Sequence, residues 1–176
     1  MGRDKTSADF LFDGEPLAAR VARRLGEVCD EVVVASGDGA RLGWLGLPQV
    51  ADTVPGRGPL AGLIAGLESA GHFFVAVVAA DMPFASPAVL RLLSSRADGF
   101  DAVLPVSDRG LEPLHAIYAR EAAAPLAAAL AAGTLAVRDA LSGLRTRVVE
   151  RSEWARADQS GRFAWNVNRP GDVHDP

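Results

Sequence analysis

The sequence predicts one α/β domain whose mainly parallel sheet is covered by helices on both faces. Along most of the chain, short apolar runs rich in β-branched residues alternate with segments in which apolar residues recur every three or four positions. The strongest strand candidate, residues 73–78, is apolar at every position, which is typical of a parallel strand buried on both faces. The chain has 176 residues, and a domain usually holds roughly 100–200, so a single domain over residues 1–176 is expected.

The first half of the chain divides into helices that start at prolines and strands that end at turn residues. Proline is favoured at the first helical position, where the missing N–H would have no partner. The expected helices are 17–25, 60–67 and 88–95, with Ser86 as the N-cap of the third. The expected strands are 31–35, 49–51, 73–78 and 101–106.

The second half of the chain is less regular but continues the alternation. Strands are expected at 113–119 and 147–150, and helices at 121–132, which is alanine-rich and ends at a glycine, and at 135–141. No repeat, low-complexity linker or block of like charge divides the chain. The one-domain α/β prediction therefore extends from end to end.

Composition and charge exclude several classes of protein. The formal net charge of −4 lacks the basic excess of a protein that binds nucleic acid or an anionic membrane, so neither partner is expected. Cys29 is the only cysteine, which excludes an internal disulfide and a zinc site built from several cysteines. The longest apolar run, 73–80, is far short of the ~20 residues of a membrane helix, and residues 1–7 are too polar for a secretory signal. We expect a cytoplasmic monomer.

Two aspartates are candidate ligand-binding residues because each follows an expected strand. In open α/β sheets, ligands bind beyond the carboxyl ends of the strands. Asp81 follows the apolar run 73–80, where its carboxylate is placed to hold Mg²⁺ against a phosphate; the alternative is an ordinary turn or N-cap aspartate. Asp52 follows the short strand 49–51.

Two glycine-containing segments are candidates for binding phosphate. Lys5 follows a glycine and two charged residues in 1–5, a pattern compatible with a phosphate cradle or with a solvated terminus. The loop 56–62 is rich in glycine and opens a helix, where backbone N–H groups favour anions. It matches neither the Walker nor the dinucleotide-binding pattern, so the signal is weak by itself.

Near the end of the chain, Asn166 and Asn168 alternate around a valine. In an extended segment both amides point to one side, where they would read a polar heterocycle or orient a phosphate. The alternative role is to cap a helix that begins at Pro170.

Taken together, these segments resemble the molybdenum cofactor guanylyltransferase family, part of a nucleotidyltransferase group with a Rossmann-like sheet. The family motifs that the chain matches in order are Met1-Gly2-Arg3-Asp4-Lys5, Asp13-Gly14-Glu15-Pro16-Leu17, Gly58-Pro59-Leu60-Ala61-Gly62, Ala80-Asp81-Met82-Pro83 and Asn166-Val167-Asn168-Arg169-Pro170. The family opens with a strand and a Leu-Ala-Gly-Gly loop, of which this chain has only the tail, so we expect the first strand to be missing and Met1 to be an internal methionine of that loop. The family's usual Asn at the end of its second strand is replaced here by Ala35 and Ser36.

The resemblance implies transfer of GMP from GTP to molybdopterin or Mo-molybdopterin, with release of pyrophosphate and with Mg²⁺ as cofactor. It places Lys5 on the phosphates, Asp52 on the nucleotide, Asp81 on the metal and the nucleotide, and Asn166 and Asn168 on the acceptor; Lys5 and Asp81 are the catalytic pair. The alternatives are a molybdopterin cytidylyltransferase, another small nucleotidyltransferase, or an inactive paralogue that binds without catalysis. Without the first strand and its loop, the chain is expected to bind GTP poorly.

Overall fold

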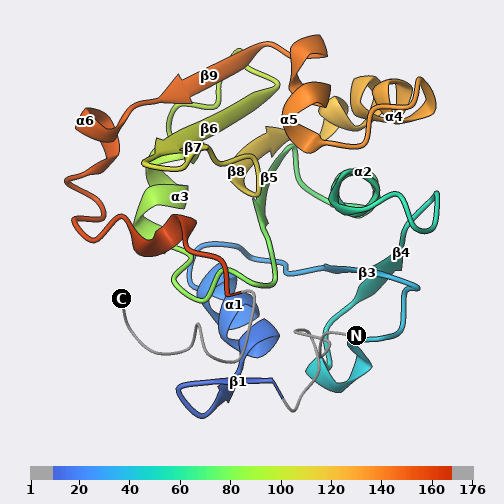
Figure 1. Ribbon diagram of the computed structural model, residues 1–176, viewed down its shortest axis with the longest axis horizontal. Coiled ribbons are helices and arrows are strands. Elements are labelled where there is room, and N and C mark those ends of the chain that lie inside the picture. Colours follow the sequence, from blue (N-terminus) through green and yellow to red (C-terminus); the bar gives the residue numbers. More distant parts are fainter. Residues whose placement is uncertain (1–9, 168–176) are drawn as a thin grey trace.

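A computed structural model describes residues 10–167 as a mixed α/β structure with helices on both sides of a central sheet (Figure 1). The strands are β1 (Leu11–Phe12), β2 (Glu15–Pro16), β3 (Val34–Gly37), β4 (Gln49–Ala51), β5 (Phe74–Val78), β6 (Ala102–Ser107), β7 (Gly110–Leu111), β8 (His115–Ala119) and β9 (Thr146–Val149). The α-helices are α1 (Leu17–Gly26), α2 (Pro59–Ser69), α3 (Pro87–Ser94), α4 (Ala123–Ala131), α5 (Val137–Ala140) and α6 (Arg151–Trp154). Single 3-10 turns lie at Gly43–Leu45, Arg120–Ala122, Leu141–Gly143 and Arg162–Ala164. None of the helices between residues 10 and 167 has the length and apolar content needed to span a bilayer.

The main sheet has five strands in the order β5-β8-β6-β7, with β9 paired to β6. Because β8 is antiparallel to both β5 and β6, and β9 is parallel to β6, the strands β5, β6 and β9 all run in the same direction. A second pair, β3 and β4, is parallel and separate from the main sheet. The predicted mainly parallel α/β fold is confirmed, with β8 and the two-residue β7 as the reversed strands of the main sheet.

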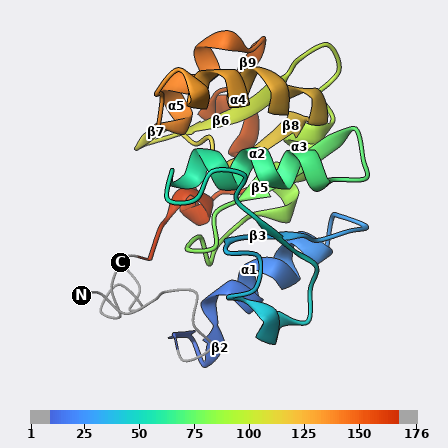
Figure 2. The ribbon, with the colours of Figure 1, turned by 90° about the vertical axis from the view of Figure 1, so that its right-hand side faces the viewer.

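Two apolar layers cover the main sheet, one on each face. On one face, α2, α4 and α5 pack against alternate residues of β6 and β8 (Figure 2): Ala102, Leu104, Ala116 and Tyr118. On the other face, α3, Trp154 and Phe163 pack against the intervening residues, which include Val103, Ile117 and Val149. This alternation follows from the period of two along a strand, and it buries both faces of the sheet.

The helices begin where the sequence places them. α1 starts directly after Pro16, and α2 and α3 have proline at their first residue. Ser86 is the N-cap of α3, and its Oγ accepts a hydrogen bond from the backbone N–H of Val89 at 3.4 Å. These starts confirm the predicted helices within one or two residues.

One predicted strand is displaced. The strand expected at 31–35 begins only at Val34, the first residue that pairs with β4, whereas Val32 and Val33 remain half-buried and outside the ladder. The hairpin β1–β2 was not predicted. It turns at Asp13 and Gly14, whose φ values of 50° and 78° lie in the left-handed region, and strands of two residues have no periodicity to detect.

Candidate functional site

A cavity of about 1400 Å³ lies between β3 and β5 and reaches the carboxyl ends of both strands. Its walls come from β3 and β5 themselves and from α1, α2 and α3. At the carboxyl end the lining includes Ser36, Asp52, Asp81 and Asn166. This is the edge at which an open α/β sheet binds its ligands.

Asp52 presents a buried carboxylate oxygen to this end of the cavity. Its backbone N–H donates to the carbonyl of Gly37 at 3.0 Å, which fixes the residue just beyond β4. Its Oδ1 has no hydrogen-bond partner among the described residues, and a Cβ added at Gly62 would lie 3.6 Å from that oxygen. Burial raises the pKa of Asp52, and the nearby Arg41 guanidinium opposes that rise. A cation or a hydrogen-bond donor placed here would offset the desolvation of the carboxylate.

Ser36 lies near Asp52, at the end of β3. The family that the sequence resembles usually has an asparagine near this point. Its side chain is buried, and its Oγ also has no hydrogen-bond partner within residues 10–167. The Ser36 hydroxyl is therefore a buried polar group, and Ser36 is one of the residues that line the cavity.

Asp81 lies at the tip of β5 on a segment held by backbone hydrogen bonds. The N–H of Ala79 donates to the carbonyl of Leu114 at 2.9 Å, and the N–H of Met82 donates to the carbonyl of Ala79 at 3.1 Å. The N–H of Val167 donates to the carbonyl of Asp81 itself at 2.8 Å, which brings the neighbouring Asn166 to the same end of the cavity.

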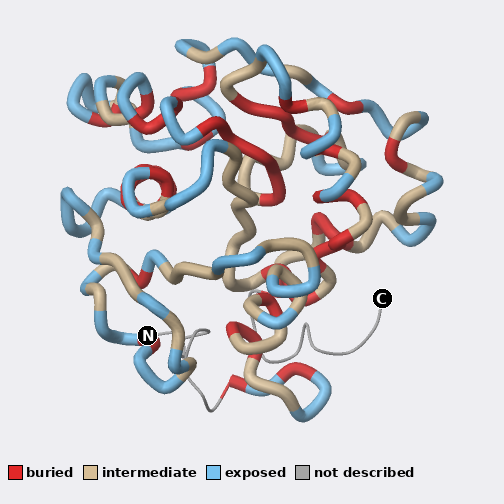
Figure 3. The backbone as a smooth tube through the Cα atoms, turned by 180° about the vertical axis from the view of Figure 1, so that it is seen from behind, coloured by how far each residue is buried: buried red, intermediate tan, exposed pale blue. Residues whose placement is uncertain are grey.

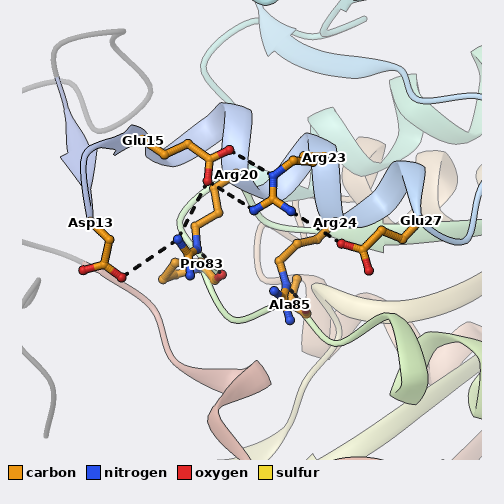
Figure 4. A network of polar contacts seen from close by, with 8 residues as sticks. All are labelled: Asp13, Glu15, Arg20, Arg23, Arg24, Glu27, Pro83 and Ala85. Carbon is orange, nitrogen blue, oxygen red and sulfur yellow. Dashed lines mark hydrogen bonds and ion pairs between the residues drawn. The ribbon is translucent and has the colours of Figure 1, made fainter.

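Helix α1 holds the loop after Asp81 from one side. The Arg20 Nε donates to the carbonyl of Pro83 at 3.1 Å, and the Arg24 Nε donates to the carbonyl of Ala85 (Figure 4). Arg20 is held in turn by ion pairs with Asp13 at 3.9 Å and with Glu15 at 3.7 Å. The acidic residues of the second family motif thus support the loop that carries Asp81.

His115 holds the same loop from the side of β8. Its ring is fully buried, lies 4.8 Å from the ring of Phe163, and accepts a hydrogen bond through Nε2 from the backbone N–H of Ser86 at 3.0 Å. Sequence reasoning missed Arg20, Arg24 and His115 as supports of the site. Their partners are backbone carbonyls and an N–H far away in the sequence, so no local pattern reveals them.

Stability is expected to depend on pH through His115. Desolvation lowers its pKa from about 6.5 to about 4, so the folded protein keeps the ring neutral while the unfolded chain takes up a proton below pH 6.5. The contribution of the neutral His115 ring to the free energy of unfolding is therefore complete above pH 6.5. It is lost as the pH falls toward 4, and the loss is roughly 3 kcal/mol. Urea unfolding of the parent and of His115→Gln at neutral pH and near pH 4.5 measures it. The free energy of unfolding should fall more steeply in the parent, and equal slopes would contradict this assignment.

The structure brings together three of the predicted site residues. Asp52, Asp81 and Asn166 line one end of one cavity, where the start of α2 and its glycine loop also lie. Gly58, the N-cap of α2, has a φ of 71°, which a residue with a Cβ rarely adopts. Lys5 and Asn168 lie outside the described residues. Within residues 10–167, no three His, Cys, Asp or Glu side chains gather into a metal-binding cluster.

Comparison with known proteins agrees with this fold. A probable molybdenum cofactor guanylyltransferase of Natronomonas pharaonis is 41% identical over 155 residues, which covers 84% of this chain and 76% of that protein. A second one, of Chloroflexus aggregans, is 35% identical over 178 residues, 98% of this chain and 85% of the relative. The crystal structure of molybdopterin-guanine dinucleotide biosynthesis protein A from Archaeoglobus fulgidus superposes with a TM-score of 0.83 at 28% identity, over 98% of this chain and 90% of that one.

A more distant structure shares the fold alone. The 2-C-methyl-D-erythritol 4-phosphate cytidylyltransferase of Thermus thermophilus is 19% identical, with a TM-score of 0.66 over 98% of this chain and 96% of its own. The family description that matches the sequence is a MobA-like NTP transferase domain, over residues 1–153. The chain therefore belongs to the MobA-like NTP transferase family.

Proposed function

We propose that this protein transfers GMP from GTP to molybdopterin or Mo-molybdopterin. A phosphate oxygen of the acceptor attacks the α-phosphorus of GTP, a new P–O bond forms, and the bond between the α- and β-phosphates breaks to release pyrophosphate. The observation that carries the proposal is the convergence of Asp52, Asp81 and Asn166 at one end of one cavity. The names of the relatives supply the substrates.

The two aspartates suit a magnesium nucleotide. Mg²⁺ usually binds through one or two carboxylates together with substrate phosphates, so a cluster of three protein ligands is not required. Asp81 would hold the ion at the tip of β5. Asp52 has a buried oxygen without a partner in the described chain, and it fits a role toward the nucleotide or the ion. When bound, Mg²⁺ neutralises charge on the phosphates during transfer.

The chain's own residues supply the remaining positioning and charge. Lys5 would place a mobile positive charge on the phosphates. The N-terminus of α2, with Gly56 and Gly58 in the cavity lining, presents backbone N–H groups to an anion. The loop that carries Asp81 is held by Arg20, Arg24 and His115, so the carboxylate is positioned before the substrate binds.

Asn166 and Asn168 are proposed to act on the acceptor. The ring of Trp165 lies 6.4 Å from that of Phe84, and the N–H of Val167 donates a hydrogen bond to the carbonyl of Asp81, so residues 165–167 lie beside Asp81. Because the reaction consumes GTP, we infer that it takes place in the cytoplasm.

Asn166→Ala and Asn168→Ala should each weaken use of molybdopterin about tenfold, the effect of one lost hydrogen bond, and leave GTP affinity nearly unchanged. Steady-state kinetics with each substrate varied in turn measures the difference. Equal loss for both substrates, together with a lower melting temperature, would instead assign the asparagines to capping.

The proposal can be tested by comparing how tightly the protein binds different nucleotides. Thermal melts and calorimetry with Mg²⁺ and either GTP, CTP, ATP or UTP should show the tightest binding for GTP. Preference for CTP would move the assignment to a cytidylyltransferase. Binding of GTP with no transfer under any condition would favour an inactive paralogue.

A further inference from the structure

A second, smaller cavity lies at the carboxyl end of β6. Its volume is about 190 Å³, and it is lined by residues 107–109, which lead from β6 toward β7, and by residues of the segment 160–165, which follows α6. Because β5 and β6 run in the same direction, this end of β6 and the tip of β5 with Asp81 lie at the same edge of the main sheet. The cavity is smaller than the roughly 300 Å³ of the smallest ordinary ligand pockets, so it suits one end of a ligand and not a whole nucleotide.

One short segment separates this small cavity from the end of the large cavity where Asp81 lies. Trp165 lines the small cavity, and its neighbour Asn166 lines the large one. The ring of Trp165 lies 6.4 Å from that of Phe84, and the N–H of Val167 donates to the carbonyl of Asp81 at 2.8 Å. A ligand with one end at Asp81 therefore needs to extend only past this segment to place its other end in the small cavity.

The walls of the small cavity are anchored to the main sheet. The strands β6 and β8 are buried over most of their length (red in Figure 3). The Trp154 Nε1 donates to the carbonyl of Val106 at 2.8 Å, and the buried ring of Phe163 lies 4.9 Å from the ring of Trp154. The loop ahead of Phe163 is closed by Asp158, whose Oδ1 accepts hydrogen bonds from two backbone N–H groups of that loop, at 3.0 and 3.2 Å. These contacts form the cavity before a ligand binds, which lowers the cost of ordering it.

A guanidinium group in the lining is available to an anion. The charged residues of the lining are Asp108, Arg109 and Arg162. The carboxylate of Asp108 accepts hydrogen bonds from Arg151 at 2.8 and 2.9 Å, which offset its negative charge. Arg109 is exposed, and although its charge acts on Glu112 through space, it forms no ion pair with a carboxylate of residues 10–167. The small cavity is therefore suited to bind an anionic group, in a chain whose formal net charge is −4.

Aromatic rings lie beside the guanidinium groups. The guanidinium carbon of Arg109 lies over the ring of Trp165, 5.8 Å from its centre. The guanidinium carbon of Arg162 lies over the ring of Phe84 at 3.7 Å. Ser107 fixes the turn that carries Arg109, because its Oγ accepts a hydrogen bond from the N–H of Arg109 at 3.0 Å. A planar cation beside an indole ring suits a ligand that is both flat and negatively charged.

We propose that the small cavity binds the end of the acceptor that lies opposite its phosphate, with Arg109 on the dithiolene sulfurs and Trp165 against the pterin. This assignment rests on the proposed function, which makes molybdopterin the acceptor. Molybdopterin has a phosphate at one end and, at the other, a flat pterin with two anionic sulfur atoms. Since the phosphate must reach GTP at Asp81, the pterin end extends away from that carboxylate. Arg109 is then a specificity-determining residue for the acceptor, in addition to Asn166 and Asn168.

Binding of molybdopterin without any nucleotide tests this site. The fluorescence of Trp165 should be quenched as molybdopterin is added under anaerobic conditions, and Trp165→Phe should lose that part of the quenching. Calorimetry should show that Arg109→Ala binds molybdopterin at least about tenfold more weakly, the effect of one charge-assisted contact, with an unchanged melting temperature. Arg156→Ala is the matched control, because Arg156 is exposed and lines neither cavity. Equal affinity of Arg109→Ala and the parent, or no binding by the parent, would overturn the proposal.

Inorganic phosphate identifies which end of the acceptor the small cavity holds. Titrated alone, phosphate should bind the parent and Arg109→Ala equally. Weaker binding of phosphate by Arg109→Ala would place the phosphate end in this cavity and overturn the assignment.

Transfer kinetics separate this proposal from the proposed function. Arg109→Ala should raise the KM for molybdopterin at least about tenfold and leave the KM for GTP unchanged. If the parent forms the conjugate and Arg109→Ala has the parent's KM for molybdopterin, the site assignment fails and the proposed function stands. If binding of molybdopterin depends on Arg109 but the parent forms no conjugate, the proposed function fails and the binding site stands.

Discussion

Replacing Asp81 with asparagine is expected to lower the rate of GMP transfer by at least about 10³-fold while the protein stays folded. The amide has nearly the same shape, and the backbone bonds that hold this residue, from Val167 to Asp81 and from Met82 to Ala79, do not involve the side chain. The change removes the negative charge that would hold Mg²⁺ at the tip of β5. Release of pyrophosphate measures the rate, with the variant compared to the parent protein.

Asp98→Asn is the matched control for this prediction. Asp98 is exposed and lies outside the cavity lining, so loss of its charge should leave the rate unchanged. A folded Asp81→Asn protein that turns over at the parent rate would show that this carboxylate belongs to the turn and has no part in catalysis.

Replacing Lys5 with alanine is expected to weaken GTP binding or slow transfer by about 10–150-fold. A charge-assisted contact with a phosphate contributes roughly 1.5–3 kcal/mol, which converts to that range. Calorimetry with GTP and Mg²⁺, combined with turnover, separates an effect on binding from an effect on the transferring step. Lys5→Arg, which keeps the charge, should retain most of the activity. Unchanged affinity and unchanged turnover in Lys5→Ala would assign this lysine to a solvated segment.

The sequence predicted the parts of the site that depend on strand ends. An apolar run that stops at Asp81, and a short strand that stops at Asp52, placed both carboxylates at the carboxyl edge of a sheet, where the structure has them. Prolines marked the starts of α1, α2 and α3 because their effect is local. Strand ends and helix starts depend on a few neighbouring residues, so the sequence alone was enough to predict them.

The remaining features depend on contacts between distant parts of the chain. The period of two in β8 indicates a strand but contains no information on its direction, which is set by pairing with β5 and β6. Val32 and Val33 have the composition of a strand, but no strand within residues 10–167 pairs with them, so they stay outside the ladder. The hydrogen bonds of Arg20 and His115 to the loop after Asp81 likewise join residues far apart in sequence.

Transfer of GMP to molybdopterin yields a conjugate of the two, so the identity of the product reports on the reaction directly. Purified protein is incubated with molybdopterin, Mg²⁺ and either GTP or CTP, and the products are identified by mass spectrometry. With GTP, we predict a conjugate of GMP and molybdopterin, together with one pyrophosphate for each conjugate formed. Formation of a cytidine conjugate alone, or of no conjugate while GTP remains bound, would contradict transfer of GMP by this protein.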